Sequence, residues 1–182
     1  MKGRLNNMKV IFLDIDGVLN NYNSWRKRKE YYDTYKIIIS SIDEECVRRL
    51  SEIVRITGAK IVLSSSWRGD WANGVNNLKL EESKQLQKLF DKYNIEIVGI
   101  TPCLPKSNNP NERYTSWREN EIKYYLETHL EIDNYCVIDD EDFDLKSLQE
   151  NLIKINSEYG IEDKHVEKAI QILNQKQNVK VI

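Results

Sequence analysis

The stretch Lys9–Leu19 constrains the fold of this chain more than any other, because it joins a buried strand to two acids. Five of its first seven residues are Val, Ile, Phe, Leu and Ile, a run typical of a parallel strand covered on both faces. Asp14 and Asp16 lie two residues apart, so their carboxylates converge unless the backbone turns between them. A divalent cation would relieve their repulsion, and Gly17 permits a turn. The same residues also fit a surface strand before an ordinary Asp-Gly turn.

A second apolar strand, Lys60–Leu63, runs directly into hydroxyl and guanidinium groups. Ser64 and Ser65 can donate hydrogen bonds to a phosphoryl oxygen, and Arg68 can add a charge-assisted pair of bonds. Because serine-rich turns are common in all proteins, this pattern gains weight only from its place at a strand end.

A third apolar strand, Tyr135–Ile138, ends in acid. Five of the six residues from Asp139 to Asp144 are acidic, and such a cluster is costly unless a cation or exposure to water relieves it. Asp139 and Asp140 lie nearest the strand. An exposed acidic turn is the alternative interpretation.

Strands near residues 10, 61, 97, 137 and 153 alternate with helical patterns. This order predicts an α/β fold, in which a parallel five-stranded sheet carries helices on both faces. Ligands of such sheets lie at the carboxyl ends of the strands, where all three polar groups fall. The length suits one domain, so we expect residues 1–182 to form a single unit.

The helices are predicted from capping and apolar periodicity. One begins at the capping box Ser41–Glu44 and ends at Gly58, and a second covers Glu81–Tyr93. Residues Gly69–Lys79 between them read as a loop. Trp117–Leu130 forms a third helix, whose N-terminus favours anions.

The overall composition excludes several classes of protein. Charged residues make up 31% and apolar residues 40%, and the net charge of −2 gives no global attraction to nucleic acid. Cys46, Cys103 and Cys136 are odd in number and widely spaced, which argues against disulfides and zinc and predicts three small buried residues. No apolar run is long enough to span a membrane, and we expect a cytoplasmic protein without a membrane partner.

The polar segment Asn20–Tyr35 places a basic run among aromatic side chains. Trp25 and Arg26 are its candidate substrate-binding residues, since such a pattern can hold a phosphate backbone and stack on bases. The alternative is a solvated loop or short helix whose aromatic rings anchor it to the body of the protein.

Together these motifs resemble the haloacid dehalogenase (HAD) superfamily, whose phosphatases attack phosphate with an aspartate. Phe12–Leu19 resembles the first motif, Ser64 matches the hydroxyl of the second, and Asp139 with Asp140 resembles the fourth motif in its DD form. The superfamily requires a basic residue between the second and fourth motifs. Arg118 at the start of a helix is favoured, with Lys106 and Lys123 as alternatives.

The resemblance implies a role for each of these residues. Asp14 would attack phosphorus to form an aspartyl-phosphate, and Asp16 would act as general acid and then as general base. Mg²⁺ would be held by Asp14, the backbone carbonyl of Asp16 and Asp140, with Asp139 in support. The transferred oxygens would be held by Ser64, the N–H of Ser65 and Arg118. Asp144 would orient a metal-bound water.

The combination of LSSSWR, R-x-x-E-I and VIDDED looks most like the small HAD domains associated with RNA-repair (Swiss Army Knife) proteins. That resemblance implies a minimal cap over residues 20–40, loop Thr101–Arg113 as a candidate wall of the site, and a phosphorylated substrate such as an RNA end, a DNA end or a nucleotide. Two other classes stay open, a phosphoacceptor signalling domain and a non-catalytic HAD-like binding module. The sequence leaves the oligomeric state open.

Overall fold

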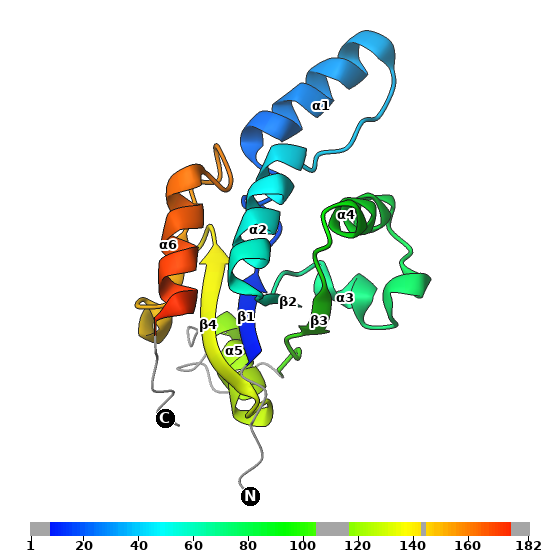
Figure 1. Cartoon of the computed structure of the whole chain (residues 1–182). Helices are drawn as coiled ribbons and strands as arrows, with labels where there is room; N and C mark the ends of the chain where they lie inside the picture. Colours follow the sequence, from blue (N-terminus) through cyan, green and yellow to red (C-terminus); the bar gives the residue numbers. More distant parts are fainter. Residues whose placement is uncertain (1–7, 105–116, 143–144, 176–182) are drawn as a thin grey trace, which may run out of the picture.

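The computed structural model describes residues 8–104, 117–142 and 145–175 of the chain. Its five strands are parallel and form one sheet in the order β3-β2-β1-β4-β5 (Figure 1). The strands are β1 Met8–Leu13, β2 Lys60–Leu63, β3 Ile97–Ile100, β4 Ile132–Asp139 and β5 Leu152–Lys154. The chain builds outward from β1 in one direction through β2 and β3, and in the other through β4 and β5. The predicted five-stranded α/β fold is confirmed, and its order reverses beside β1.

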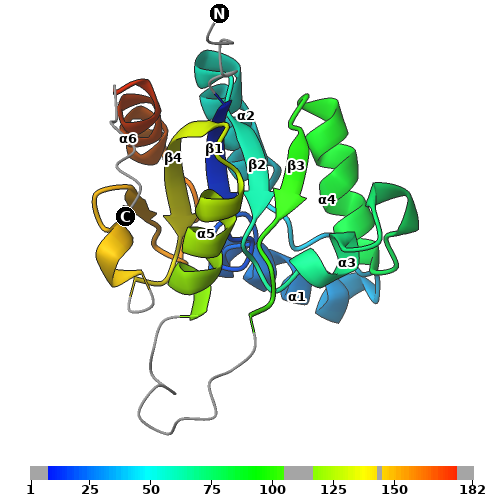
Figure 2. The same ribbon diagram turned by 90° about the horizontal axis from the view of Figure 1, so that it is seen from below.

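Helices cover both faces of this sheet, as predicted. They are α1 Tyr22–Tyr35, α2 Glu44–Thr57, α3 Arg68–Trp71, α4 Glu81–Lys92, α5 Trp117–Thr128 and α6 Asp163–Asn174, with the short 3₁₀ turns η1 Val75–Asn77 and η3 Lys146–Leu148. α2, α4 and α6 pack on one face, and α5 lies on the other (Figure 2). The segment expected to be a loop between β2 and α4 contains α3 and η1, so that prediction is wrong.

Alternation along β1 divides the core between the two faces. Ile11 and Leu13 belong to the apolar cluster under α2 and α6, whereas Val10 and Phe12 belong to the cluster under α5. The Phe12 ring meets Tyr125 of α5 edge to face, with 5.7 Å between ring centroids. All four β1 side chains are fully buried, which explains the continuous apolar run in the sequence.

The start of α2 differs from the predicted capping box. The helix begins at Glu44, and its N-cap is Asp43, whose Oδ1 accepts a hydrogen bond from Glu45 N at 3.0 Å. Aspartate is at least as good an N-cap as serine, and Asp43 lies two residues closer to the apolar face than Ser41 does. The end was predicted correctly, because Gly58 takes the left-handed conformation with φ 70°.

The aromatic and basic segment forms the long helix α1 rather than a loop. Asn21 caps the helix, and its side chain accepts a hydrogen bond from Ser24 N at 2.8 Å. Within α1, the buried residue is Ser24. The helix projects beyond the carboxyl ends of the strands, the end to which the β4 arrow points in Figure 1. The aromatic rings of α1 therefore do not anchor it to the core, and its description as a minimal cap stays a prediction.

Two smaller predictions have clear outcomes. Cys46 and Cys136 are buried as expected, but Cys103 is exposed because it lies in the connection after β3. Within the described part of the chain, no helix has the length and apolar character needed to cross a membrane.

Candidate active site

The register of the sheet brings three strand ends together. Leu13, the last residue of β1, is paired with the last residue of β2 on one side and with Ile138 of β4 on the other. Ser64 N donates to Leu13 O and Asp14 N donates to Ile138 O, both at 3.0 Å, so the ladders continue beyond the strand ends. Asp14 is therefore flanked by Ser64 on one side and by Asp139 on the other.

Three acids form a cluster at this point. Ligand oxygens of Asp14, Asp139 and Asp140 all lie within 4.8 Å of one another, and the first two residues are buried. Gly17 permits the close approach, since it has φ 72° and a Cβ there would lie only 2.2 Å from Asp140 Oδ2. Side chains from the ends of β1 and β4, distant in sequence, thus share one site.

Arg118, at the beginning of α5, faces this acid cluster. Its Nη1 lies 2.5 Å from Asp139 Oδ2 and 3.5 Å from Asp14 Oδ1. Burial raises the pKa of Asp14 to about 7, an effect that Arg118 opposes and Asp139 increases. Burial likewise raises the pKa of Asp139 and of Asp140. Three carboxylates facing one guanidinium leave a negative charge that a divalent cation would balance.

The hydroxyl of Ser64 is an unusual group beside this cluster. Ser64 is fully buried, and its Oγ has no hydrogen-bond partner among the described residues. Buried hydroxyls are normally hydrogen-bonded, so this one indicates a place for an oxygen that the protein does not supply. The neighbouring Ser65 hydroxyl contacts Asp14 and lowers the pKa of its carboxyl group.

A family model described as the HAD domain in Swiss Army Knife RNA repair proteins matches residues 10–166, which include every residue of this cluster. The chain belongs to this family. No curated protein and no solved structure matches it. Membership confirms the resemblance found in the sequence and supports a phosphatase-like function in general terms.

In this HAD domain the second aspartate of the first motif lies apart from the acid cluster. Asp16 is exposed, and its carboxylate accepts hydrogen bonds from Asn20 Nδ2 at 2.7 Å and from Trp67 Nε1 at 3.0 Å. The three-acid cluster does not include this carboxylate. The only metal contact predicted for Asp16 uses its backbone carbonyl, which these side-chain contacts leave unaffected.

A pocket of about 460 Å³ opens over the site. Its lining includes the predicted catalytic and metal-binding residues Asp14, Asp16, Arg118 and Asp140, and two aromatic residues of α1, Tyr22 and Trp25. Trp25, predicted to bind substrate, therefore lies beside the acids. The pocket is also lined by Asn20, Ser66 and Ser157, none of which was predicted as a site residue. Ser157 comes from the connection between β5 and α6, for which the sequence carries no motif.

Arg68, predicted to bind substrate, makes contacts within the protein. It donates to the carbonyl oxygens of Ser64 and Ser65 at 2.9 and 3.2 Å, and it forms an ion pair with Glu121 of α5 at 2.8 Å. These contacts join the loop after β2 to α5. Binding of substrate by Arg68 stays a prediction.

Arg26 lies away from the acid pocket. Its guanidinium contacts Asn23 and Glu158, and it lines a separate pocket in which Trp25 takes no part. Adjacent residues of a helix point about 100° apart, so Trp25 and Arg26 cannot both face the acids. Binding of substrate by Arg26 stays a prediction, and its contacts place it outside the pocket that holds the acids.

The remaining candidates for the basic residue are placed differently. Lys123 of α5 pairs with Glu119 at 2.8 Å, whereas Arg118 contacts the acid cluster. Lys106, Asp144 and most of the loop predicted as a wall of the site lie outside the described residues.

Proposed function

We propose that this HAD domain is a Mg²⁺-dependent phosphomonoester hydrolase that works through a covalent phosphoaspartate. The observation that carries the proposal is the position of Asp14 at the reversal of strand order, between the orphan hydroxyl of Ser64 and the guanidinium of Arg118. A nucleophile, an oxygen-binding hydroxyl and a fixed positive charge are the elements that phosphoryl transfer requires.

In the first step, an oxygen of Asp14 attacks phosphorus and forms an O–P bond while the ester O–P bond breaks on the opposite side. Arg118 and the hydroxyl of Ser64 stabilise the charge on the transferred oxygens. Asp16, in its protonated form, gives its proton to the departing oxygen. The products of this step are the free alcohol and a phosphorylated Asp14.

In the second step, water attacks the phosphorus of the phosphoaspartate. Asp16, now ionised, takes a proton from that water, and the bond between Asp14 and phosphorus breaks. Inorganic phosphate leaves and both aspartates return to their starting states. A phosphoacceptor signalling domain would preserve the phosphoaspartate, and the presence of Asp16 at the pocket supports hydrolysis instead.

The donor atoms of the site fit a small, hard cation. Asp14 and Asp140 offer carboxylate oxygens, the cradle at Gly17 admits Asp140, and the excess negative charge needs a partner. The carboxylate of Asp139 already accepts hydrogen bonds from Arg118 and from Glu141 N. It is therefore better suited to support the metal site than to bind the ion directly. Mg²⁺ bound here would neutralise phosphate charge and align the ester for attack.

The proposed substrate is a phosphomonoester at the end of a nucleic acid or on a nucleotide. The description of the family names RNA repair, and the aromatic residues Tyr22 and Trp25 at the pocket supply flat faces for a base. A small sugar phosphate would need no such faces.

A panel of phosphomonoesters tests this proposal. Phosphate release should occur with p-nitrophenyl phosphate, nucleotides and oligonucleotides phosphorylated at either end, and it should stop in excess chelator and return with Mg²⁺. Ca²⁺ takes more ligands at longer distances than Mg²⁺ and should not restore turnover. Full turnover in chelator or in Ca²⁺ would refute the metal requirement, and no turnover on any ester would leave the non-catalytic binding module as the better description.

A further inference from the structure

The helix α1 begins at the acid pocket and extends away from it. Its first turn supplies Tyr22 and Trp25 to the pocket lining, and Tyr22 N donates to Ser157 O at 2.9 Å. Ser24 fixes the base of the helix through a hydrogen bond from its Oγ to Ser41 O at 2.6 Å. The rest of α1 projects from the body (Figure 1), so its outer faces are open to a ligand that enters the pocket.

One face of α1 alternates aromatic and basic side chains. Trp25, Lys29, Tyr32 and Lys36 follow one another at steps of four, three and four residues, which places them on one face along the helix and its C-cap. Lys29 Nζ lies 5.9 Å from the centroid of the Trp25 ring, and Lys36 Nζ lies 5.5 Å from that of Tyr32. Trp25 is 53% exposed and Tyr32 45% exposed. We call these four residues the α1 stripe.

The lysines of the stripe carry positive charge that nearby acids do not neutralise. On the flanks of α1, Arg26 pairs with Glu158 and Arg28 pairs with Glu82. Among the described residues, Lys29 and Lys36 have no carboxylate within ion-pair distance. Lys36 Nζ donates to Asp33 O at 3.1 Å, a contact that leaves its charge in place. The stripe thus offers flat apolar rings and positive charges without carboxylate partners in alternation, which suits a strand of bases and phosphates.

We propose that the α1 stripe binds the unpaired strand of a nucleic acid whose terminal phosphate occupies the acid pocket. The inference rests on the proposed function and adds the surface that selects single strands. The rings of Trp25 and Tyr32 lie seven residues apart, about 10 Å along the helix, which matches roughly three stacked nucleotides. Base faces are open to stacking in a single strand and closed in a duplex.

A second copy of the chain is the competing occupant of this face. Two copies that met through the stripe in a symmetric dimer would bring the same lysines close together. Repulsion between Lys29 and Lys36 of the two copies would oppose that contact, whereas phosphates would attract them. Charge therefore favours nucleic acid.

Binding is measured by fluorescence anisotropy with the Asp14→Asn chain, so that turnover does not consume the probe. The probe is a labelled single strand of roughly ten nucleotides, as RNA and as DNA, with a phosphate at the unlabelled end. The test variant adds Tyr32→Ala and Lys36→Gln. The control variant adds Tyr35→Ala and Lys27→Gln, which change the same residue types on another face of α1.

The test variant should bind about tenfold more weakly, because stacking on one ring is lost, and its salt dependence should fall by about 0.7 in slope for the one lysine removed. The control variant should bind like the parent, and a blunt duplex of the same sequence should bind at least about tenfold more weakly than the single strand. Equal losses in test and control, equal binding of duplex and single strand, or a parent dimer that Tyr32→Ala dissociates would each overturn the proposal.

The same double changes in the chain with intact Asp14 separate this inference from the proposed function. Neither Tyr32 nor Lys36 lines the acid pocket, so turnover of p-nitrophenyl phosphate should stay within about twofold of the parent. If the double variant keeps its activity on that ester and binds the oligonucleotide as the parent does, the proposed role of the α1 stripe is wrong and the proposed hydrolase activity stands. Absence of all turnover would refute the proposed hydrolase activity. The binding comparison would still show whether the α1 stripe binds single strands.

Discussion

At the scale of single residues, the two aspartates of the first motif have different surroundings and hence different chemistry. Asp14 is buried, and burial raises its pKa to about 7 while Arg118 favours its charged form. Asp16 is exposed at the pocket and is held by side-chain donors on Asn20 and Trp67. A buried nucleophile beside a cation and an accessible acid at the rim fit the two roles proposed for them.

Trp67 positions Asp16, and its replacement should show that role. Trp67→Phe removes the donor at 3.0 Å, so proton transfer to the leaving oxygen becomes less efficient. A nucleotide, whose alkoxide leaves poorly, should lose about tenfold or more in kcat/KM, whereas p-nitrophenyl phosphate, whose phenolate needs little help, should lose much less. Steady-state kinetics on both esters make the measurement.

Trp71→Phe is the matched control, because Trp71 Nε1 donates to Gln87 at 3.2 Å and has no part in the pocket. It should leave the ratio of the two kcat/KM values unchanged. If Trp67→Phe lowers kcat/KM for both esters by the same factor, Trp67 stabilises the fold and does not position the general acid.

At the scale of elements, a buried ion pair joins the start of α3 to α5. Arg68 and Glu121 are both largely buried, with side-chain exposures of 13% and 8%. Arg68 also holds the carbonyl oxygens of Ser64 and Ser65, and Leu104 N donates to Glu121 at 3.3 Å. The pair thus connects the hydroxyl motif to the helix that carries Arg118.

Arg68→Met should lower the free energy of unfolding by about 3 kcal/mol, because it leaves the charge of Glu121 buried without its partner. The double variant Arg68→Met, Glu121→Leu should recover part of that loss, since it removes both charges. Urea unfolding measures both. Arg48→Met, which breaks an exposed pair with Glu45, should cost far less than Arg68→Met. An equally small loss for Arg68→Met would show that its pair is not structural.

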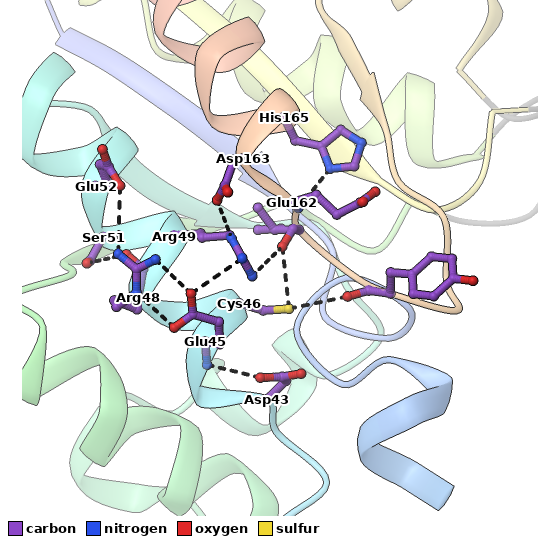
Figure 3. Close-up of polar contacts among 12 residues, drawn as sticks. Asp43, Glu45, Cys46, Arg48, Arg49, Ser51, Glu52, Glu162, Asp163 and His165 are labelled. Atoms are coloured by element: carbon purple, nitrogen blue, oxygen red, sulfur yellow. Dashed lines mark hydrogen bonds and ion pairs between the residues drawn. The ribbon is translucent and has the colours of Figure 1, made fainter.

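A second structural feature at this scale is the N-terminal cap of α6, which packs against α2. His165 is buried, and its Nδ1 accepts a hydrogen bond from Glu162 N at 3.0 Å (Figure 3). That nitrogen can accept only while the ring is neutral. Burial lowers the pKa of His165, in agreement with a ring kept uncharged in the fold.

His165 should therefore make the protein less stable in mild acid. Below its ordinary pKa of about 6.5 the unfolded chain binds a proton that the folded chain resists, so the free energy of unfolding falls as pH falls. His165→Gln keeps an acceptor at the third helical position without titrating in this range. Between about pH 7.5 and about pH 5.5, urea unfolding should show a larger loss in the parent than in His165→Gln. Equal losses would assign the effect to other groups.

At the scale of the whole molecule, the sequence revealed the sheet and the acids better than it revealed the walls of the pocket. Asp14, Ser64 and Asp139 each follow an apolar run, and parallel pairing with Leu13 in the centre is enough to bring them together. Ser157 and Glu121 act through partners far away in the chain, 53 residues for the Arg68–Glu121 pair, and no local pattern signals such contacts.

Helix α1 was harder to predict for a different reason. Its buried surface is confined to its base, so no apolar periodicity distinguishes its faces, and basic and aromatic residues surround it on all sides. Only the fold shows that Trp25 turns to the acid pocket while Arg26 turns to Glu158. The direction of a side chain on a projecting helix depends on where the helix leaves the body, which the sequence does not encode locally.

The covalent role of Asp14 depends on the whole arrangement of the sheet edge, and rapid chemical quenching followed by mass spectrometry tests it. The Asp16→Asn chain with Mg²⁺ and p-nitrophenyl phosphate, whose phenolate needs little help from a general acid, should accumulate one phosphoryl group on the peptide that contains Asp14, because removal of the general base slows the second step. The Asp14→Asn chain, folded like the parent by circular dichroism, should carry none and should not turn over. Turnover by a folded Asp14→Asn chain, or a phosphoryl group on another residue, would contradict the mechanism.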